Sequence, residues 1–258
     1  MTEEVDFNRR FGGVKRLYGA VGLTKLQAAH VVVVGIGGVG SWAAEALARN
    51  AVGKITVVDL DNIAESNVNR QIHAVDGEFG KAKVTAMRKR IHQINPNCVV
   101  REIEDFVTVE NASTLLNFNF DVLVDCIDDA PAKAVLAATC KALIKPIIMS
   151  GSAGGRLDPT RIKVADLSAV TNDKLLAKVR NILRRDYGFP NASNSKKLNK
   201  FAVQCVYSDE PVTKPALAYE ADSTAITGLN CAGYGSSVCV TAPMGFAAAQ
   251  LAINLIVA

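Results

Sequence analysis

Short apolar runs alternate with longer amphipathic segments through the first half of the chain. Several of these runs are bounded by turn residues and are predicted to be strands: residues 31–34, 55–60, 99–103, 121–126 and 146–150. The segments between them are predicted to be helices: residues 41–50, 81–94, 109–116 and 131–144. Strands and helices that alternate over short connections are typical of a doubly wound, mainly parallel sheet. We therefore expect a Rossmann-like α/β fold.

The pattern changes after Gly151, where turn signals become frequent. Further elements are predicted here: strands at residues 162–164 and 201–207, a basic amphipathic helix at residues 173–187, and a mobile polar loop at residues 190–200. No internal repeat is visible. We expect a single domain over residues 1–258, with a core at residues 7–155 and a C-terminal extension at residues 156–258.

The last part of the sequence is apolar and carries no charged residue from Ser223 to Ala258. Residues 238–258 are long enough to span a bilayer. However, Pro243 and Gly245 interrupt them, and no Lys or Arg follows as an anchor. We therefore expect a helix of the core or of a dimer interface rather than a membrane-spanning helix.

Composition narrows the functional classes. The chain combines 49% hydrophobic residues with a net charge of +4, so it can bury a large core and has a mild preference for anionic partners. Its six cysteines include no C-x-x-C pair, so a structural zinc site is not expected. The first ten residues are polar and do not resemble a signal peptide. A reducing cytoplasm is the expected location.

A glycine-rich turn follows the first predicted strand. Residues 35–40 read Gly-Ile-Gly-Gly-Val-Gly, and a predicted helix begins directly after them. In this context Gly35 permits a tight turn, Gly37 lets the backbone approach a phosphate, and Gly40 allows the helix to pack closely on the strand. We expect the amides at the start of the helix to bind the phosphate chain of a nucleotide.

Polar residues after the next strands indicate which nucleotide is bound. Asp59 ends the second strand, where a carboxylate accepts hydrogen bonds from ribose hydroxyls and where a nicotinamide dinucleotide remains possible. Arg70 and Lys83 add two cations at the same edge of the sheet, which suits the triphosphate of ATP better. Asp128 follows the fourth strand and is placed to hold Mg²⁺ beside phosphate oxygens. It is also a candidate N-cap for the helix that contains Pro131.

Together with the run Asn67-x-Asn69-Arg70-Gln71 and the pair Asp125-x-x-Asp128, these residues resemble the adenylation domain of the ubiquitin-activating (E1-like; ThiF/MoeB/HesA) superfamily over residues 7–155. The resemblance implies that Asp59 binds the ribose and that Asp128 handles Mg²⁺. The ATP-binding residues that it implies are Gly35, Gly37, Gly38, Gly40, Asp59, Asp61, Asn67, Asn69, Arg70, Gln71, Lys83 and Asp128. It also implies that an arginine near the N-terminus reaches into the site of a neighbouring subunit. Arg10 is the candidate for this role, with Arg9 as the alternative.

Motifs along the rest of the chain narrow the resemblance. Residues 10–13 (Arg-Phe-Gly-Gly), 69–74 (Asn-Arg-Gln-Ile-His-Ala) and 158–160 (Asp-Pro-Thr) are similar to those of the bacterial tRNA threonylcarbamoyladenosine dehydratases. That family implies ATP-dependent cyclisation of threonylcarbamoyladenosine next to the tRNA anticodon, carried out by a homodimer. The substrate carboxylate is expected to become an acyl-adenylate, and the carbamoyl group then closes an oxazolone or a hydantoin ring. A protein of the cysteine desulfurase sulfur-transfer system is a further candidate partner.

Enzymes of the same superfamily that adenylate the C-terminus of a ubiquitin-like sulfur carrier are the main alternative. Such enzymes often carry a zinc site made of two C-x-x-C pairs, which this sequence lacks. Cys231 lies in a glycine-rich segment and is a candidate catalytic nucleophile, but ring closure within one substituent does not require a protein thiolate. A nicotinamide dehydrogenase and a non-catalytic nucleotide-binding scaffold would also fit the glycine turn. His73 is expected to pack within its loop.

Basic residues of the extension are candidates for tRNA binding. Lysine and arginine are concentrated in the predicted helix at residues 173–187 and in the loop after it. A basic face of this kind suits the phosphates of an RNA stem, although it also suits a solvated helix face. The candidates are Lys178, Arg180, Arg184, Arg185, Lys196 and Lys197.

Overall fold

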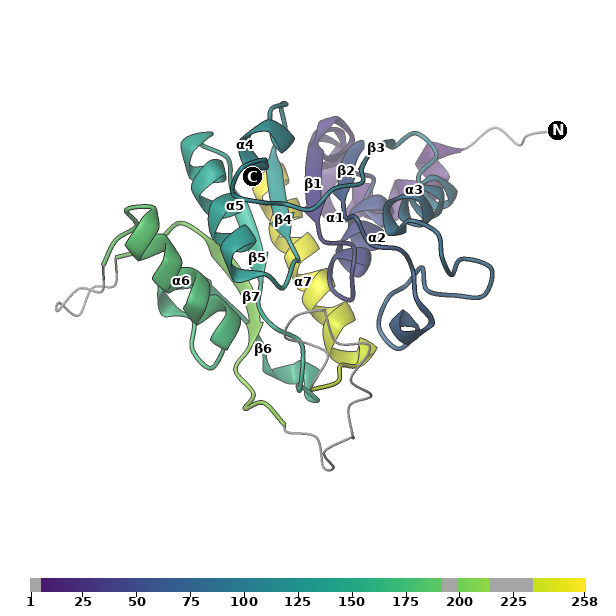
Figure 1. The fold of residues 1–258 in the computed structure, drawn as a ribbon. Coiled ribbons are helices and arrows are strands. Elements are labelled where there is room, and N and C mark those ends of the chain that lie inside the picture. The colour runs from purple at the N-terminus through teal and green to yellow at the C-terminus, as the bar shows by residue number, and fades with distance from the viewer. Residues whose placement is uncertain (1–5, 192–198, 214–233) are drawn as a thin grey trace.

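The computed structural model describes residues 6–191, 199–213 and 234–258, and a seven-stranded sheet runs through its centre (Figure 1). The strands are β1 (His30–Val34), β2 (Lys54–Val58), β3 (Val99–Ile103), β4 (Val122–Asp125), β5 (Ile147–Ser150), β6 (Ile162–Asp166) and β7 (Gln204–Ser208). Their order across the sheet is β3-β2-β1-β4-β5-β7-β6, and all neighbours are parallel except β6 and β7. The predicted Rossmann-like, mainly parallel α/β fold is confirmed.

The strand order reverses at the centre of the sheet. β1 pairs with β2 on one side and with β4 on the other, so that Val32 lies opposite both Thr56 and Leu123. The C-terminal extension continues the same sheet, because β7 pairs in parallel with β5 and β6 forms the edge. In open sheets of this kind ligands bind beyond the carboxyl ends of the strands at the reversal, which are β1 and β4 here.

Helices cover both faces of the sheet (Figure 1). In the described residues they are α1 (Phe7–Ala28), α2 (Gly40–Arg49), α3 (Lys83–Ile94), α4 (Ala112–Leu115), α5 (Ala130–Ala142), α6 (Lys174–Asp186) and α7 (Val238–Val257), with 3₁₀ turns η1 (Glu65–Asn67), η2 (Pro159–Arg161) and η3 (Leu167–Ala169). α1, α2, α3 and α7 pack on the face toward which Val31 and Val33 of β1 point. α5 and α6 pack on the other face, with Val32 and Val34.

The predicted apolar helix at the end of the sequence is α7, and it packs along the sheet. Val240, Met244 and Ala248 are buried in the core. Gly245 lies where α7 crosses α2, and a β-carbon there would lie 2.5 Å from the carbonyl oxygen of Val39, so this close crossing requires glycine. α7 is the one helix of the described residues that is long and apolar enough to cross a membrane, and half of its apolar stretch is buried inside the protein.

The first helix, α1, has no counterpart among the predicted elements. Its N-cap is Asp6, whose carboxylate accepts a main-chain hydrogen bond at 2.9 Å. Glycines lower the helix propensity of this segment, and the backbone leaves the helical region at Gly19, where φ is +75°. Only Phe11, Gly22 and Leu26 of the helix are buried. The helix therefore has no continuous apolar stripe from which periodicity would predict it.

Candidate active site

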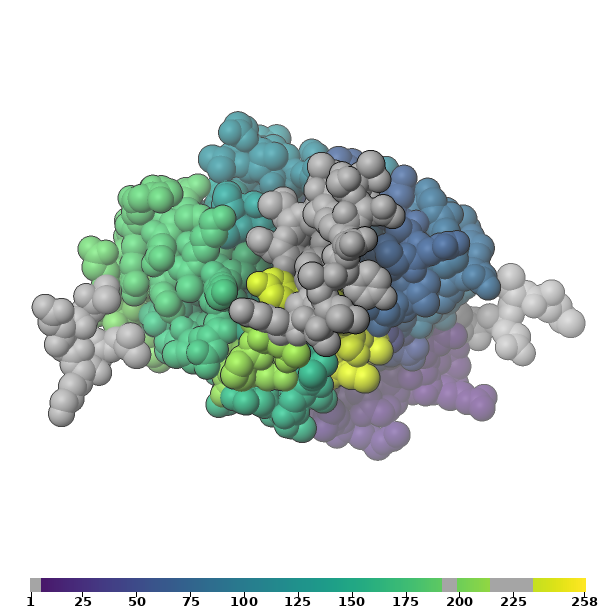
Figure 2. Space-filling model, turned by 60° about the horizontal axis from the view of Figure 1, so that its bottom comes forward, coloured from purple at the N-terminus to yellow at the C-terminus, as the bar shows by residue number. Residues whose placement is uncertain are grey.

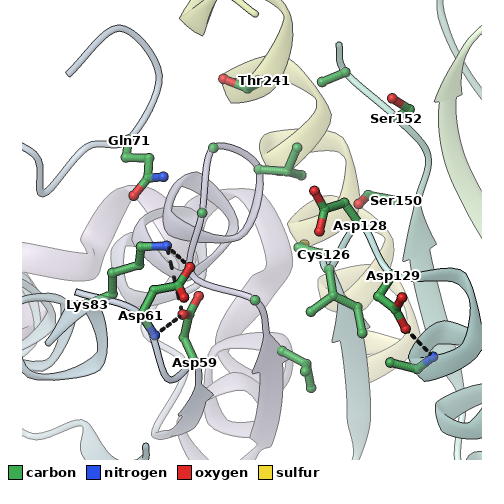
Figure 3. Close-up of a pocket in the computed structure, with 18 of the residues that line it drawn as sticks. Asp59, Asp61, Gln71, Lys83, Cys126, Asp128, Asp129, Ser150, Ser152 and Thr241 are labelled. Carbon is green, nitrogen blue, oxygen red and sulfur yellow. Dashed lines mark hydrogen bonds and ion pairs between the residues drawn. The ribbon is translucent and has the colours of Figure 1, made fainter. Parts of the chain in front are cut away.

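A cavity of about 460 Å³ opens at the carboxyl ends of β1, β2, β4 and β5. Figure 2 shows the molecule from this side, with part of α7 in yellow between the first half of the chain in blue and the green region that includes α6. The polar side chains that line the cavity are those of Asp59, Asp61, Arg70, Gln71, Lys83, Asp105, Cys126, Asp128, Asp129, Ser150, Ser152, Ser236 and Thr241. Asp59, Asp61 and Lys83 lie on one side of the glycine turn, and Asp128 and Ser150 lie on the other (Figure 3).

The glycine turn between β1 and α2 forms one wall of this cavity. Gly35 has a φ of +82°, and a β-carbon there would lie 2.9 Å from the main chain of the segment after β4. A β-carbon at Gly40 would collide with the carbonyl oxygen of Gly35, so the turn closes onto α2 only with glycine. Gly35, Gly37 and Gly38 line the cavity, whereas Gly40 lies behind it. Bare main chain therefore faces the space in which phosphates are expected.

Asp59, Asp61 and Lys83 form a hydrogen-bonded group beside the turn (Figure 3). Asp59 Oδ2 accepts a hydrogen bond from the main-chain N of Ile36 at 2.6 Å, and its Oδ1 accepts one from that of Asp61 at 2.9 Å. Lys83 Nζ lies 2.7 Å from Asp61 Oδ2 and 3.9 Å from Asp59 Oδ1. Burial raises the pKa of Asp59, and the charge of Lys83 opposes this shift. Since Lys83 is only 5% exposed, its charge acts mainly within the site.

Two of the predicted residues of the polar loop face the cavity, and two maintain the shape of the loop. Arg70 and Gln71 line the cavity. Asn69 Oδ1 accepts a hydrogen bond from Arg70 Nη1 at 3.0 Å, and Asn69 Nδ2 donates to the carbonyl of Ser236 at 2.7 Å. Asn67 Oδ1 accepts a main-chain hydrogen bond at the start of η1. Neither asparagine lines the cavity, and their hydrogen bonds hold Arg70 and its loop in position; ATP binding by the two asparagines stays a prediction.

The sequence leaves two roles open for Asp128, a ligand of Mg²⁺ and the N-cap of the helix that contains Pro131. The structure divides these roles between Asp128 and Asp129. The N-cap of α5 is Asp129, because its Oδ1 accepts a hydrogen bond from the main-chain N of Ala132 at 2.8 Å. The carboxylate of Asp128 points into the cavity instead (Figure 3). The cavity walls partly desolvate it, which raises its pKa. A carboxylate in this position fits the preference of Mg²⁺ for ligands shared with phosphate oxygens.

A buried ion pair lies behind the turn that carries Asp128. Asp125 and Lys133 are both fully buried, and Lys133 Nζ lies 3.1 Å from Asp125 Oδ1. The same Nζ donates a hydrogen bond to the carbonyl of Ile127 at 2.8 Å. Asp125 Oδ1 accepts one from the main-chain N of Ile127 at 3.2 Å. The pair therefore fixes the turn immediately before Asp128. A lysine at a core position of the apolar helix α5 is the one signal of it in the sequence.

Other predicted residues lie outside the described part of the chain or away from the cavity. Cys231, Lys196 and Lys197 fall outside the described residues. Arg10 is exposed on α1, and its Nη1 donates a hydrogen bond to the carbonyl of Ile94 at the end of α3, at 2.9 Å. It does not line the cavity of its own chain.

The basic residues of α6 differ in their surroundings. Lys178 and Arg185 are exposed, seven positions apart on the helix. Arg180 Nη1 donates to two main-chain carbonyls in and after η3, at 3.2 and 2.9 Å. Arg184 Nε donates to a main-chain carbonyl that follows the helix, at 3.2 Å. Arg180 and Arg184 thus secure neighbouring segments. Lys174, Lys178 and Arg185 lie open to solvent, and Arg185 Nε also pairs with Asp186 Oδ1 at 2.7 Å.

Cys126 lines the cavity next to the Asp128 turn. Burial raises the pKa of its thiol to about 12. The thiol is therefore protonated near neutral pH, and nucleophilic attack needs the thiolate. Its place in the wall gives Cys126 a packing role rather than a nucleophilic one.

His73 is buried next to the site without reaching it, and it packs within its loop as predicted. It is 3% exposed and does not line the cavity. Neither ring nitrogen has a hydrogen-bond partner in the described residues. Burial lowers the pKa of His73 to about 4, and the positive charges of Lys83 and Arg90 contribute to the shift.

We expect His73 to make the protein less stable as the pH falls from about 6.5 to about 4. In this range the unfolded chain binds a proton at His73 and the folded chain does not, so each pH unit removes about 1.4 kcal/mol of unfolding free energy. Urea unfolding at several pH values measures the decline, and His73→Leu should make it shallower. Equal declines in the two proteins would contradict this assignment.

Comparison with known proteins gives the family of the chain. The model of the ThiF family matches residues 9–257. A tRNA threonylcarbamoyladenosine dehydratase of Haemophilus influenzae is 45% identical over 96% of this chain and 94% of the relative. Crystal structures of the E. coli tRNA N6-threonylcarbamoyladenosine dehydratase TcdA in complex with ATP and with AMP are 41% and 40% identical. Both have a TM-score of 0.87 and cover 99% of this chain and 97% of their own. The chain belongs to the ThiF family.

Proposed function

We propose that this protein is an ATP-dependent tRNA threonylcarbamoyladenosine dehydratase. The observation that carries the proposal is the cavity, where a bare glycine turn meets the cations Arg70 and Lys83 and the carboxylate of Asp128. A relative named for that activity matches nearly the whole chain. Crystals of another contain ATP or AMP, the nucleotides that begin and end an adenylation.

Each wall of the cavity offers a group that suits one part of ATP. The glycine turn and the N-terminus of α2 bind the phosphates, because unpaired amides and the helix dipole favour anions there. Arg70 and Lys83 neutralise the phosphates from one side. Asp59 accepts hydrogen bonds from the ribose hydroxyls. Asp128 would hold Mg²⁺, which would supply further neutralisation of the triphosphate.

The reaction begins at the carboxylate on the threonine moiety of the substrate, which is a poor electrophile until it is activated. One carboxylate oxygen attacks the α-phosphorus of ATP, pyrophosphate leaves, and an acyl-adenylate forms. An oxygen or nitrogen of the carbamoyl group then attacks the activated carbonyl, and AMP leaves with the former carboxylate oxygen. The ring closes with a net loss of one water. Because the attacking group is already tethered to the carbonyl, this sequence requires no thiolate from Cys231.

The proposal predicts that the protein, ATP and Mg²⁺ together remove one water from threonylcarbamoyladenosine in substrate tRNA. Mass spectrometry of the digested nucleosides measures this loss. We expect AMP and cyclised nucleoside in equal amounts, since one adenylation drives one ring closure. AMP formation that depends on a protein ending in Gly-Gly, with the tRNA unchanged, would instead favour adenylation of a sulfur carrier.

We further propose that the protein acts as a homodimer in the cytoplasm. Leu17 and Val21 lie on either side of the Gly19 kink in α1 and are 72% and 71% exposed, so a second copy that covered them would bury apolar surface. Arg10 lies on the same helix and is the proposed arginine for the cavity of the neighbouring subunit. A protein of the cysteine desulfurase system is a further proposed partner, for sulfur transfer.

The exposed side of α6 is the proposed tRNA-binding surface. Lys174, Lys178 and Arg185 are exposed along it. Lys196 and Lys197, which fall outside the described residues, are also proposed to bind tRNA. In Figure 2 the green region that includes α6 lies on the left, on the opposite side of the view from the first half of the chain in blue. Cations in this position bind the phosphates of the anticodon stem while the modified base enters the cavity.

Replacing Lys178 and Arg185 with alanine is expected to flatten the salt dependence of tRNA binding. Each lost phosphate contact should reduce the slope of log K against log salt by about 1, because fewer counterions are released. Filter binding between about 50 and 200 mM salt measures the slope. Lys89→Ala, on α3 at the other end of the sheet, is the matched control (Figure 1). If the double variant keeps the slope of the wild type, tRNA binds elsewhere.

A further inference from the structure

One wall of the cavity is joined directly to the first turn of α6. Residues 150–154 continue from the end of β5 and line the cavity. α6 carries the exposed cations of the proposed tRNA surface. Two hydrogen bonds connect these segments, from Ser152 to Asp173 and from Arg156 to Asn172.

Asp173 makes the first connection with both of its carboxylate oxygens. Its Oδ1 accepts a hydrogen bond from the main-chain N of Leu176 at 2.9 Å, which caps α6. Its Oδ2 accepts one from the main-chain N of Ser152 at 2.8 Å. Asp173 is 4% exposed, so both bonds are shielded from water. Gly151 permits the approach, because a β-carbon there would collide with Asp173 Oδ2.

Arg156 makes the second connection. It binds Asn172, the residue immediately before the cap of α6. Its side chain is 1% exposed, and Nη2 donates a hydrogen bond to the carbonyl of Asn172 at 2.7 Å. Asn172 has a φ of +58°, and its own amide donates to the carbonyl of Asp209 at 3.2 Å. The residues before α6 are therefore held by the segment that continues from the cavity wall.

We propose that Asp173 and Arg156 form a brace, which is the pair of hydrogen bonds to Ser152 and Asn172 that joins the cavity wall to α6. The brace fixes the position of the wall relative to tRNA bound on α6. Asp173 and Arg156 are both positioning residues for ring closure, and neither lines the cavity. Residues 150–154 form no helix or strand of their own beyond Ser150, so their position depends on what they are bonded to. Ring closure is sensitive to such position, since a displacement of about 1 Å can cost about 100-fold in rate. The inference rests on the proposed function.

Asp173→Asn tests the brace with little change to the helix. Asparagine caps helices as well as aspartate does, so one oxygen still accepts from Leu176. Its amide nitrogen cannot accept from Ser152, so the connection to the wall is lost. We expect kcat for the loss of water from tRNA to fall about tenfold, with the dissociation constants of ATP and tRNA within twofold of the wild type. Gly151→Ala, which displaces the same carboxylate from the other side, should have the same effect.

The matched control is Asp158→Asn, because Asp158 caps η2 in the same manner and makes no bond to the cavity wall. Its kcat should stay within twofold. A normal kcat in Asp173→Asn would overturn the brace. A fall in kcat accompanied by equal losses of both affinities and of Tm would also overturn it, since that is the result of a purely structural role. A wild-type protein that removes no water from tRNA would refute the proposed function itself.

Discussion

Replacing Asp128 with asparagine is expected to lower kcat for tRNA dehydration by about 100-fold or more while the protein stays folded. The carboxylate points into the cavity and forms no cap, so the substitution removes no hydrogen bond that holds α5. What it removes is a charge directed into the cavity, at the proposed site for Mg²⁺ and the phosphates. The loss of one group that is preorganised for the transition state typically costs about 10²–10³ in rate.

The affinity for ATP separates this role from a general weakening of the site. The glycine turn, Arg70 and Lys83 remain, so the dissociation constant of ATP should change by less than about threefold. The Mg²⁺ concentration that gives half-maximal rate should rise. Asp129→Asn is the matched control, because asparagine keeps the cap of α5 and should retain most of the activity. Equal kcat values in the two variants would show that Asp128 has no special role.

The fold was predictable from the sequence because each buried strand is a short apolar run bounded by turn residues. All five residues of β1 are buried, four of them valines, and turn residues bound the strand. The carboxyl ends of parallel strands meet at one edge of the sheet, which is why the sequence alone predicts one site for Asp59, Lys83 and Asp128. By contrast, the sequence does not predict α1. Only three of its residues are buried, and its glycines lower the helix propensity of the segment.

The finer division of roles within the site depends on tertiary contacts that no local pattern encodes. Asn67 and Asn69 lie in the same polar loop as Arg70, and only the folded loop shows that the asparagines support it while the arginine lines the cavity. Asp128 is the cap candidate in the sequence, and only the first turn of α5 shows that the next residue, Asp129, forms the cap. In the same way, Arg180 reads as a surface cation, although its guanidinium is bonded to backbone carbonyls.

Lys133→Met is expected to destabilise the protein by about 3–5 kcal/mol, which is the cost typical of removing one partner from a buried ion pair. Methionine fills a similar volume, so the loss comes from the charge left on Asp125 rather than from a cavity. Asp125 is fully buried, and its Oδ2 has no hydrogen-bond partner in the described residues. Urea unfolding measures the change in free energy.

The pH dependence of the stability of Lys133→Met tests whether the charge left on Asp125 causes the loss. Burial raises the pKa of Asp125, and Lys133 is the largest influence that opposes the shift. Without Lys133 the folded chain holds a proton on Asp125 at pH values where the unfolded chain has lost it, so the stability deficit shrinks as the pH falls. Adding Asp125→Asn to Lys133→Met should recover most of the lost stability, since no charge then remains buried. A single variant that loses less than about 1 kcal/mol would mean that the pair is not what holds the Asp128 turn. A double variant that recovers its stability but has a low kcat for tRNA dehydration would show that the ion pair positions Asp128 rather than stabilising the fold.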